Sequence, residues 1–379
     1  MVAVSDTAAK LRRALAGTIG SPGWRAALEA IPRELFLGDA VYLPDPARAD
    51  RWTPVRREQV GADDWPAMAY TDQTWVTQVD GLLAEDATET VTGSPSSSST
   101  LPGLVVRMLE DAQISEGDRV LEIGTGTGYS TALMCHRIGG EAVTSVEYDP
   151  AVAERARRAI GRFGCTPTLA VGDGLHGHDE NAPYDRLIAT CSVRTIPPAW
   201  MRQVRDGGTI LAPMWGWMGG VASAHLTPAG DGTAGGRFLT QDLYFMTARS
   251  HLAPPRPPVT TGTGEARESR IDPGVFDDDT AVFVAQLAAP AAQQAWAGDT
   301  LILLDVGTGS RADVRPGLGG GWIVHQHGPL RLWDDVEDAI VTWRAAGSPH
   351  QSGFGLTVTP DRQFVWLGEP DGPCWDLPA

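Results

Sequence analysis

The sequence predicts an α/β protein built around a mostly parallel, doubly wound sheet. Between about residues 100 and 213, short apolar segments alternate with segments of helical pattern. One apolar segment runs directly into a glycine-rich turn at residues 124–128, which opens a helix. Strands that alternate with helices pair in parallel through right-handed crossovers, and the helices then cover both faces of the sheet.

The first 95 residues are expected to form a helical and irregular region. Residues 7–18 and 22–31 have the pattern of two short helices, and Ser21 followed by proline is a typical helix start. Residues 37–95 contain scattered tryptophans and a polar, Ser/Thr-rich end. We expect irregular structure with a few strands there, covering one side of the core.

Residues 96–250 are expected to form the core domain. Its predicted strands are 119–123, 142–147, 168–171, 185–190 and 209–213. Its predicted helices are 104–111, 129–138, 151–163 and 198–204. Two further segments, 221–226 and 238–245, flank a Gly-rich stretch and are expected to form a hairpin that closes the sheet edge.

A linker and a second domain are expected after the core. Residues 251–275 are rich in proline and glycine, which continue neither a helix nor a strand. Residues 276–379 then return to regular patterns and predict a C-terminal α+β domain. Its expected helices are 278–287 and 334–346, and its expected strands are 301–304, 322–325, 355–359 and 363–367.

Composition and charge limit the kinds of partner that the protein is expected to bind and indicate its cellular compartment. The net charge of −17 argues against nucleic acid as the main partner, because phosphate binding needs a basic surface. The four cysteines form no CxxC pair, and the histidines near the C-terminus lie on different elements, so no metal site is expected. Neither a signal peptide nor a membrane-spanning run is recognised. We expect a cytoplasmic protein that does not contact membranes.

The glycine-rich turn predicts a nucleoside cofactor and favours S-adenosylmethionine (SAM). Gly124, Gly126 and Gly128 occupy its first, third and fifth positions. Dinucleotide enzymes place the third glycine at the sixth position, which is Tyr129 here. The fifth position is common in SAM enzymes. SAM lacks a pyrophosphate, so the start of the helix would face the methionine carboxylate instead.

Two acidic residues that follow neighbouring strands support this interpretation. Glu147 ends the second strand and can accept hydrogen bonds from both ribose hydroxyls, while Asp173 follows the third and can accept one from the adenine amino group. Two plainer readings remain open: Glu122 binds only turn amides, and Asp173 only caps a turn. The ordered set still favours SAM in a Rossmann-like core. The expected cofactor residues are Glu122, Gly124, Thr125, Gly126, Gly128, Glu147, Tyr148, Asp173 and Gly174.

Five stretches of the chain resemble protein-L-isoaspartate O-methyltransferases. They are residues 31–36 (IPRELF), 101–110 (LPGLVVRMLE), 117–129 (GDRVLEIGTGTGY), 172–174 (GDG) and 196–198 (IPP). The first two separate this family from other methyltransferases. The resemblance implies a SAM-dependent carboxyl O-methyltransferase acting on aspartyl groups of peptides or proteins.

The chain departs from the family where the acceptor is bound. The family has a Thr-Ile-Ser-Ala-Pro stretch whose serine lies beside the acceptor carboxylate, and the matching residues here are 98–102 (SSTLP). The resemblance therefore implies that Thr100, with Ser99 beside it, orients the acceptor. Arg194, just after the fourth strand, is expected to hold the substrate's second carboxyl oxygen or a backbone carbonyl. The alternative is a surface arginine paired with a local acid.

The variant serine run, the loop at residues 191–194 (CSVR) and the long tail after about residue 250 resemble a branch of the family associated with ribosomally made, modified peptides, such as lanthipeptides, lasso peptides and graspetides. That branch implies a cyclised precursor peptide as partner, bound with the help of residues 276–379. The methyl ester of one of its aspartates then closes to a succinimide (aspartimide), which persists or hydrolyses to isoaspartate. The alternatives are a housekeeping isoaspartate repair enzyme and a non-catalytic SAM-binding subunit.

Overall fold

The computed structural model describes residues 6–19, 21–61, 63–257 and 264–378. The chain divides into two compact units: Met1–Thr190 with Arg202–Leu211, and Cys191–Met201 with Ala212–Ala379. Residues 1–5 of the expected N-terminal region and residues 258–263 of the expected linker lie outside the described residues.

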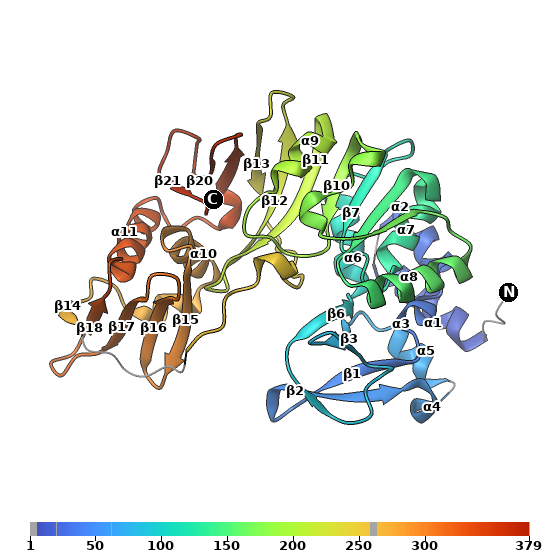
Figure 1. The fold of residues 1–379 in the computed structure, drawn as a ribbon, viewed down its shortest axis with the longest axis horizontal. Helices are drawn as coiled ribbons and strands as arrows, with labels where there is room; N and C mark the ends of the chain where they lie inside the picture. The colour runs from blue at the N-terminus through green and yellow to red at the C-terminus, as the bar shows by residue number, and fades with distance from the viewer. Residues whose placement is uncertain (1–5, 20, 62, 258–263, 379) are drawn as a thin grey trace. The chain divides into compact units, whose positions relative to one another are not determined.

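The first unit contains the predicted parallel sheet. Its strands run in the order β11-β10-β7-β8-β9, and each neighbouring pair is parallel (Figure 1). The prediction of a doubly wound α/β core is therefore confirmed. The strands are β7 (Val120–Ile123), β8 (Val143–Glu147), β9 (Thr168–Val171), β10 (Tyr184–Ala189) and β11 (Val204–Trp215). The helices of this region are α6 (Pro102–Asp111), α7 (Tyr129–Ile138) and α8 (Pro150–Phe163); α9 (Pro198–Gln203), like β11, has residues in both units.

Local sequence signals explain where these elements begin and end. All four residues of β7 are buried, as expected for a central parallel strand. Helix α8 starts at Asp149, whose carboxylate accepts hydrogen bonds from two backbone N–H groups of the first turn, with Pro150 at the first helical position. It ends at Gly164 in the left-handed conformation (φ 93°).

An antiparallel sheet and five helices form the N-terminal part of the first unit. The sheet order is β4-β3-β1-β2-β5, and β6 also pairs with β3. The strands are β1 (Ala40–Asp45), β2 (Arg48–Arg56), β3 (Trp75–Val79), β4 (Leu82–Leu83), β5 (Val91–Thr92) and β6 (Pro95–Ser99). The helices are α1 (Asp6–Thr18), α2 (Pro22–Ala30), α3 (Arg33–Leu37), α4 (Arg57–Val60) and α5 (Asp64–Ala69). Residues 37–95 are thus more regular than expected.

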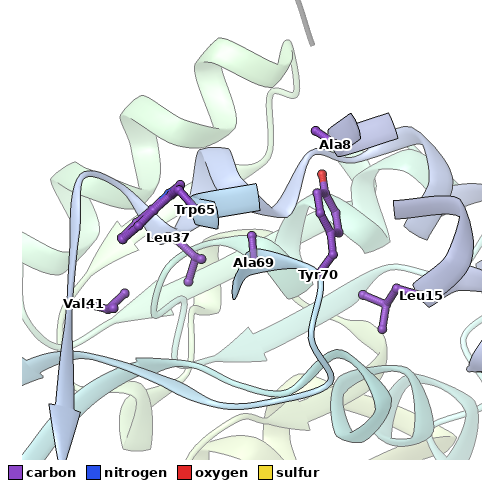
Figure 2. Close-up of a cluster of buried hydrophobic side chains, with 7 residues drawn as sticks. All are labelled: Ala8, Leu15, Leu37, Val41, Trp65, Ala69 and Tyr70. Carbon is purple, nitrogen blue, oxygen red and sulfur yellow. The ribbon is translucent and has the colours of Figure 1, made fainter. Parts of the chain in front are cut away.

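A small apolar core holds this N-terminal part together. Figure 2 shows the side chains of this cluster, which come from α1, α3, β1 and α5; Trp65 of α5 is fully buried. Ala69 and Tyr70, at the end of α5, belong to the same cluster. Their burial fixes the path of the chain that follows α5.

The second unit combines antiparallel strands with two longer helices. Strands β12, β13, β19, β20 and β21 pair in that order, and a separate sheet runs β14-β18-β17-β16-β15. The first set is β12 (Val221–Pro228), β13 (Ala234–Phe238), β19 (Phe354–Val358), β20 (Gln363–Leu367) and β21 (Cys374–Asp376). The second set is β14 (Glu265–Glu268), β15 (Ala292–Ala297), β16 (Thr300–Asp305), β17 (Ser310–Pro316) and β18 (Trp322–His327). The helices are α10 (Asp279–Ala288) and α11 (Leu332–Ala345).

Short 3-10 turns lie between several of these elements. They are η1 (Gly140–Ala142), η2 (Gly174–His176), η3 (Asp179–Asn181), η4 (Arg249–His251), η5 (Pro273–Asp277) and η6 (Gln351–Gly353). Among the described residues, no helix combines the length and the apolar character that crossing a bilayer requires.

The expected hairpin at residues 221–245 needs a correction. The partner of β12 is β13 (Ala234–Phe238), not residues 238–245, and β13 is not an edge because it also pairs with β19. Of the glycines that indicated a turn, Gly235 and Gly236 lie inside β13, whereas Gly230 and Gly232 precede it. A Cβ atom at Gly236 would lie 1.9 Å from the carbonyl oxygen of His225, so close strand approach requires glycine there.

Candidate functional site

The glycine-rich turn follows β7 and has a backbone that only glycine adopts easily. Gly124, Gly126 and Gly128 have φ angles of 99°, 54° and 86°. A Cβ atom at Gly124 would lie 2.6 Å from the Thr190 hydroxyl, and one at Gly128 would lie 2.9 Å from Ile160. Gly124 and Gly128 are therefore needed for packing against Thr190 and Ile160, and the turn has a bare backbone at the start of α7.

Glu122 lies beneath this turn and is fully buried. Its carboxylate accepts hydrogen bonds from Thr131 (2.5 Å), Ser145 (2.7 Å) and Ser130. Burial raises its pKa to about 7, against the opposing effect of these three hydroxyls. The partners are side chains of α7 and β8 rather than turn amides. Glu122 thus ties the first turn of α7 to β8.

Glu147 faces the glycine turn from the end of β8. One carboxylate oxygen accepts from the N–H of Gly126 (2.8 Å), and the other from the N–H of Asp149 (3.1 Å). The next residue, Tyr148, has 51% of its surface exposed. Thr125 is buried and shares a 2.7 Å hydrogen bond with Ser145. The residues at the end of β8 that are predicted to contact the nucleoside therefore lie against the glycine turn.

Asp173 and Gly174 follow β9. One oxygen of Asp173 accepts from the N–H of Leu175 (2.9 Å), so the capping role weighed as an alternative does exist for this oxygen. Gly174 is required by close packing, because a Cβ atom there would lie 2.4 Å from Ile123 of β7. The carboxyl ends of β7, β8 and β9 carry all the predicted cofactor residues.

Strand β6 brings the expected acceptor hydroxyls to the same place. A Cβ atom at Gly126 would lie 3.6 Å from the carbonyl oxygen of Ser98, which is ordinary contact. Ser99 is 1% exposed, and its hydroxyl has no hydrogen-bond partner within the described part of the chain. Thr100 follows directly and is half-buried. The serine-rich strand and the cofactor turn are thus in contact.

A residue that the sequence reasoning did not single out, Arg33 of α3, organises the end of β6. It is fully buried, and burial lowers its pKa to about 10. Its guanidinium donates to five backbone carbonyls at 2.7–3.2 Å, those of Ala69, Thr71, Gln73, Ser99 and Thr100. The guanidinium also lies 5.9 Å from the ring of Tyr129, the first residue of α7. The signal for this role in the sequence was an arginine inside the mainly apolar stretch 31–36 (IPRELF).

Gln78 of β3 provides a second link that was missed. Its side chain is buried and donates to the carboxylate of Asp149 (2.9 Å), the cap of α8, and to the carbonyl of Gly81 (3.1 Å). It also accepts from the hydroxyl of Ser96 (2.9 Å). The antiparallel sheet is therefore fastened to the turn that carries Glu147.

Arg194 belongs to the second unit. Its guanidinium stacks on Trp217 at 3.5 Å and donates to the carbonyl of Pro290 (2.7 Å), while its backbone N–H donates to His251 (3.0 Å). Burial lowers its pKa to about 10. Across the described ranges no carboxylate pairs with it, so the alternative of a surface ion pair is not what the structure shows.

The aromatic residues of the C-terminal region serve mainly as core. Trp333, Trp343 and Trp366 are at most 5% exposed. His325 lies 2.7 Å from Arg315, and the residues that the structure describes contain no cluster of three or more metal-ligating side chains. All four cysteines are free thiols.

Comparison with known proteins connects this geometry to one family. Residues 49–219 match the family model described as protein-L-isoaspartate(D-aspartate) O-methyltransferase (PCMT). A protein-L-isoaspartate O-methyltransferase of Ignicoccus hospitalis is 40% identical over 115 residues, covering 30% of this chain and 54% of its own. One from Thermotoga maritima is 38% identical over 124 residues, covering 32% of this chain and 39% of its own. The chain thus spans about half or less of these curated relatives.

A solved structure extends the likeness in fold to both units. It is titled protein-L-isoaspartate O-methyltransferase and superposes with a TM-score of 0.53 at 21% identity. The match covers 95% of this chain and 99% of that one. At this identity the match shows the fold alone, and it shows that a tail of this kind also accompanies a protein with that title.

Proposed function

We propose that this chain, whose residues 49–219 carry the PCMT-family core, is a SAM-dependent carboxyl O-methyltransferase acting on aspartyl groups of a peptide or protein. One observation carries the proposal. The glycine turn with Glu147 beside it is in contact with the serine-rich strand β6, which supports a cofactor site and an acceptor site that are adjacent.

The residues at the three strand ends fit this cofactor. The bare backbone of Gly124–Gly128 and the start of α7 suit the amino-acid part, Glu147 suits the ribose hydroxyls, and Asp173 with Gly174 suits the adenine. Tyr148 offers an exposed ring beside them. When bound, SAM supplies a sulfonium-linked methyl group to a carboxylate oxygen.

The protein's own task is then positioning. An aspartyl carboxylate is already ionised at neutral pH, with an ordinary pKa of about 4, so no strong base is needed. Ser99 and Thr100 donate hydroxyl hydrogen bonds that orient the carboxylate, and the buried setting of β6 excludes water. Alignment of this kind can contribute roughly 7–11 kcal/mol to lowering a barrier.

Two acceptors are compatible with this site. The first is an aspartate of a cyclised ribosomal precursor peptide, favoured by the serine-rich β6 that replaces the usual acceptor stretch. After esterification, the next residue's amide nitrogen attacks the ester carbonyl, methoxide leaves as methanol, and a succinimide forms. The second is isoaspartate in aged proteins, favoured by the shared fold of both units with the protein so titled.

A comparison of peptide substrates tests both candidate acceptors. The enzyme is incubated with SAM and matched peptides that carry aspartate in a ring, aspartate in a linear chain, or isoaspartate. Mass spectrometry of the cyclic peptide should show gain of one methyl group followed by loss of methanol. Transfer confined to linear isoaspartyl peptides would reject the precursor-peptide acceptor and support repair.

Glu147→Ala is expected to weaken SAM binding by about 10–100-fold, because a charge-assisted hydrogen bond contributes roughly 1.5–3 kcal/mol. Isothermal titration calorimetry measures the change. Glu154→Ala, which removes an exposed carboxylate paired with Arg157 on α8, is the control and should leave SAM affinity unchanged. Equal affinities of Glu147→Ala and the native protein would remove Glu147 from the cofactor site.

Thr100→Ala and Ser99→Ala are expected to keep SAM affinity and to slow methyl transfer by about 10–100-fold, since each removes one orienting hydrogen bond. Single-turnover transfer and calorimetry separate the two effects. Thr53→Ala removes an exposed hydroxyl from the same antiparallel sheet, which shares a hydrogen bond with Thr90, and serves as the control. Unchanged transfer in both variants would exclude these hydroxyls from the acceptor site.

A further inference from the structure

A recess in the second unit has one charged group in a mainly apolar wall. It is open to solvent and has a cavity volume of about 30 Å³, and Arg194 lines it. Much of its remaining surface is apolar. The walls include Met214, Trp215, Phe238, Phe283, Leu287 and Val365.

Arg194 is held in place without being neutralised. Stacking on Trp217 fixes the plane of its guanidinium, and the carbonyl of Pro290 accepts from one of its terminal nitrogens. A guanidinium carries five N–H donors, so one neutral carbonyl satisfies only a small part of its capacity. The group remains charged at neutral pH, since burial lowers its pKa only to about 10.

The other polar side chain of the recess cannot serve as its counter-charge. Both polar atoms of the Gln286 side chain bond to the backbone of Gly220. Its oxygen accepts from the N–H of Gly220 (3.0 Å), and its nitrogen donates to the carbonyl of Gly220 (2.9 Å). The chain has 47 acidic and 30 basic side chains, yet within the described residues no acid pairs with Arg194. A half-buried cation that has no counter-ion, in a protein rich in acidic residues, is expected to bind an anionic group of another molecule.

We infer that this recess binds a carboxylate of the peptide substrate together with an apolar side chain next to it. The inference rests on the proposed function for the peptide nature of the ligand. A carboxylate matches the planar guanidinium and carries a single charge, whereas a phosphate dianion would meet one cation and apolar walls. The carboxylate belongs either to an acidic side chain or to the peptide's C-terminus.

In this inference Arg194 is a specificity element. A peptide held there uses a second acidic group, distinct from the one that is methylated.

Calorimetry with probe peptides tests the anchor directly on the full chain. The probes are acetyl-Leu-Asp-Leu-Phe-amide, acetyl-Leu-Asn-Leu-Phe-amide and acetyl-Leu-Asn-Leu-Phe with a free C-terminal carboxylate. We expect one or both acidic probes to bind at least about 10-fold more tightly than the uncharged one, with salt weakening the difference. The acidic probe that binds more tightly identifies the source of the carboxylate.

Variants make the test specific to Arg194. Arg194→Gln should abolish the preference for acidic probes, and Arg194→Lys should retain only part of it because the planar fork is lost. Arg237→Gln is the matched control: Arg237 also stacks on a tryptophan, Trp366 at 4.8 Å, but is exposed and paired with Glu369. It should keep the full preference.

The anchor and the proposed function can be rejected independently of each other. Equal binding of all three probes, or an unchanged preference in Arg194→Gln, would overturn the anchor even if methyl transfer is observed. A preference for acidic probes that depends on Arg194, with no transfer to any aspartyl or isoaspartyl peptide, would support the anchor and count against the proposed function.

Discussion

Arg33→Met is expected to destabilise the protein by about 3–5 kcal/mol and to abolish most methyl transfer. The substitution removes donors to five backbone carbonyls, and a buried acceptor left without a partner costs about 1–3 kcal/mol. The carbonyls belong to the chain after α5 and to the end of β6, so the position of Ser99 and Thr100 is lost with them.

Urea unfolding measures the stability change, and transfer assays on the folded fraction measure the effect on activity. Arg33→Lys should be intermediate, because an ammonium has three donors and cannot reproduce the planar fork. The control is Arg137→Met on α7, which loses only stacking on Trp24 at 4.4 Å, worth about 1 kcal/mol. A similar small loss in Arg33→Met would contradict the role assigned to Arg33.

The second large expected effect is a dependence of the free energy of unfolding on pH. The buried carboxyl of Glu122 has a pKa of about 7, against an ordinary value of 4.5. Between these values the unfolded chain has released this proton while the folded protein still holds it. Stability from this group is therefore fully present below about pH 4.5 and is lost as the pH rises through 7. A shift of this size corresponds to about 3 kcal/mol.

Glu122→Gln is expected to remove this pH dependence. Glutamine keeps the shape, and the hydroxyls of Ser130, Thr131 and Ser145 can turn to accept as well as donate. Unfolding free energies measured from pH 4 to 8 should fall by about 3 kcal/mol more in the native protein than in the variant. Glu141→Gln, at an exposed position in the short turn after α7, is the control. Parallel profiles for Glu122→Gln and the native protein would refute the assignment.

Much of the fold was predictable because it is encoded locally. The predicted ranges 129–138, 168–171 and 363–367 match α7, β9 and β20 residue for residue. Helices and strands are set by the periodicity of apolar residues and by caps such as Asp149 and Gly164, all of which lie close together in the sequence. The glycine turn was recognisable for the same reason.

The sequence alone therefore determined the order of strands and helices between about residues 100 and 213, and where the glycine turn and its acids fall. Only the tertiary structure decided which side chains meet. It showed that Arg33 reaches carbonyls up to 67 residues away, that β13 takes β19 as a second partner, and that Arg194 stacks on Trp217 without an acid. Such contacts join residues far apart in the chain, and packing rather than local pattern selects them.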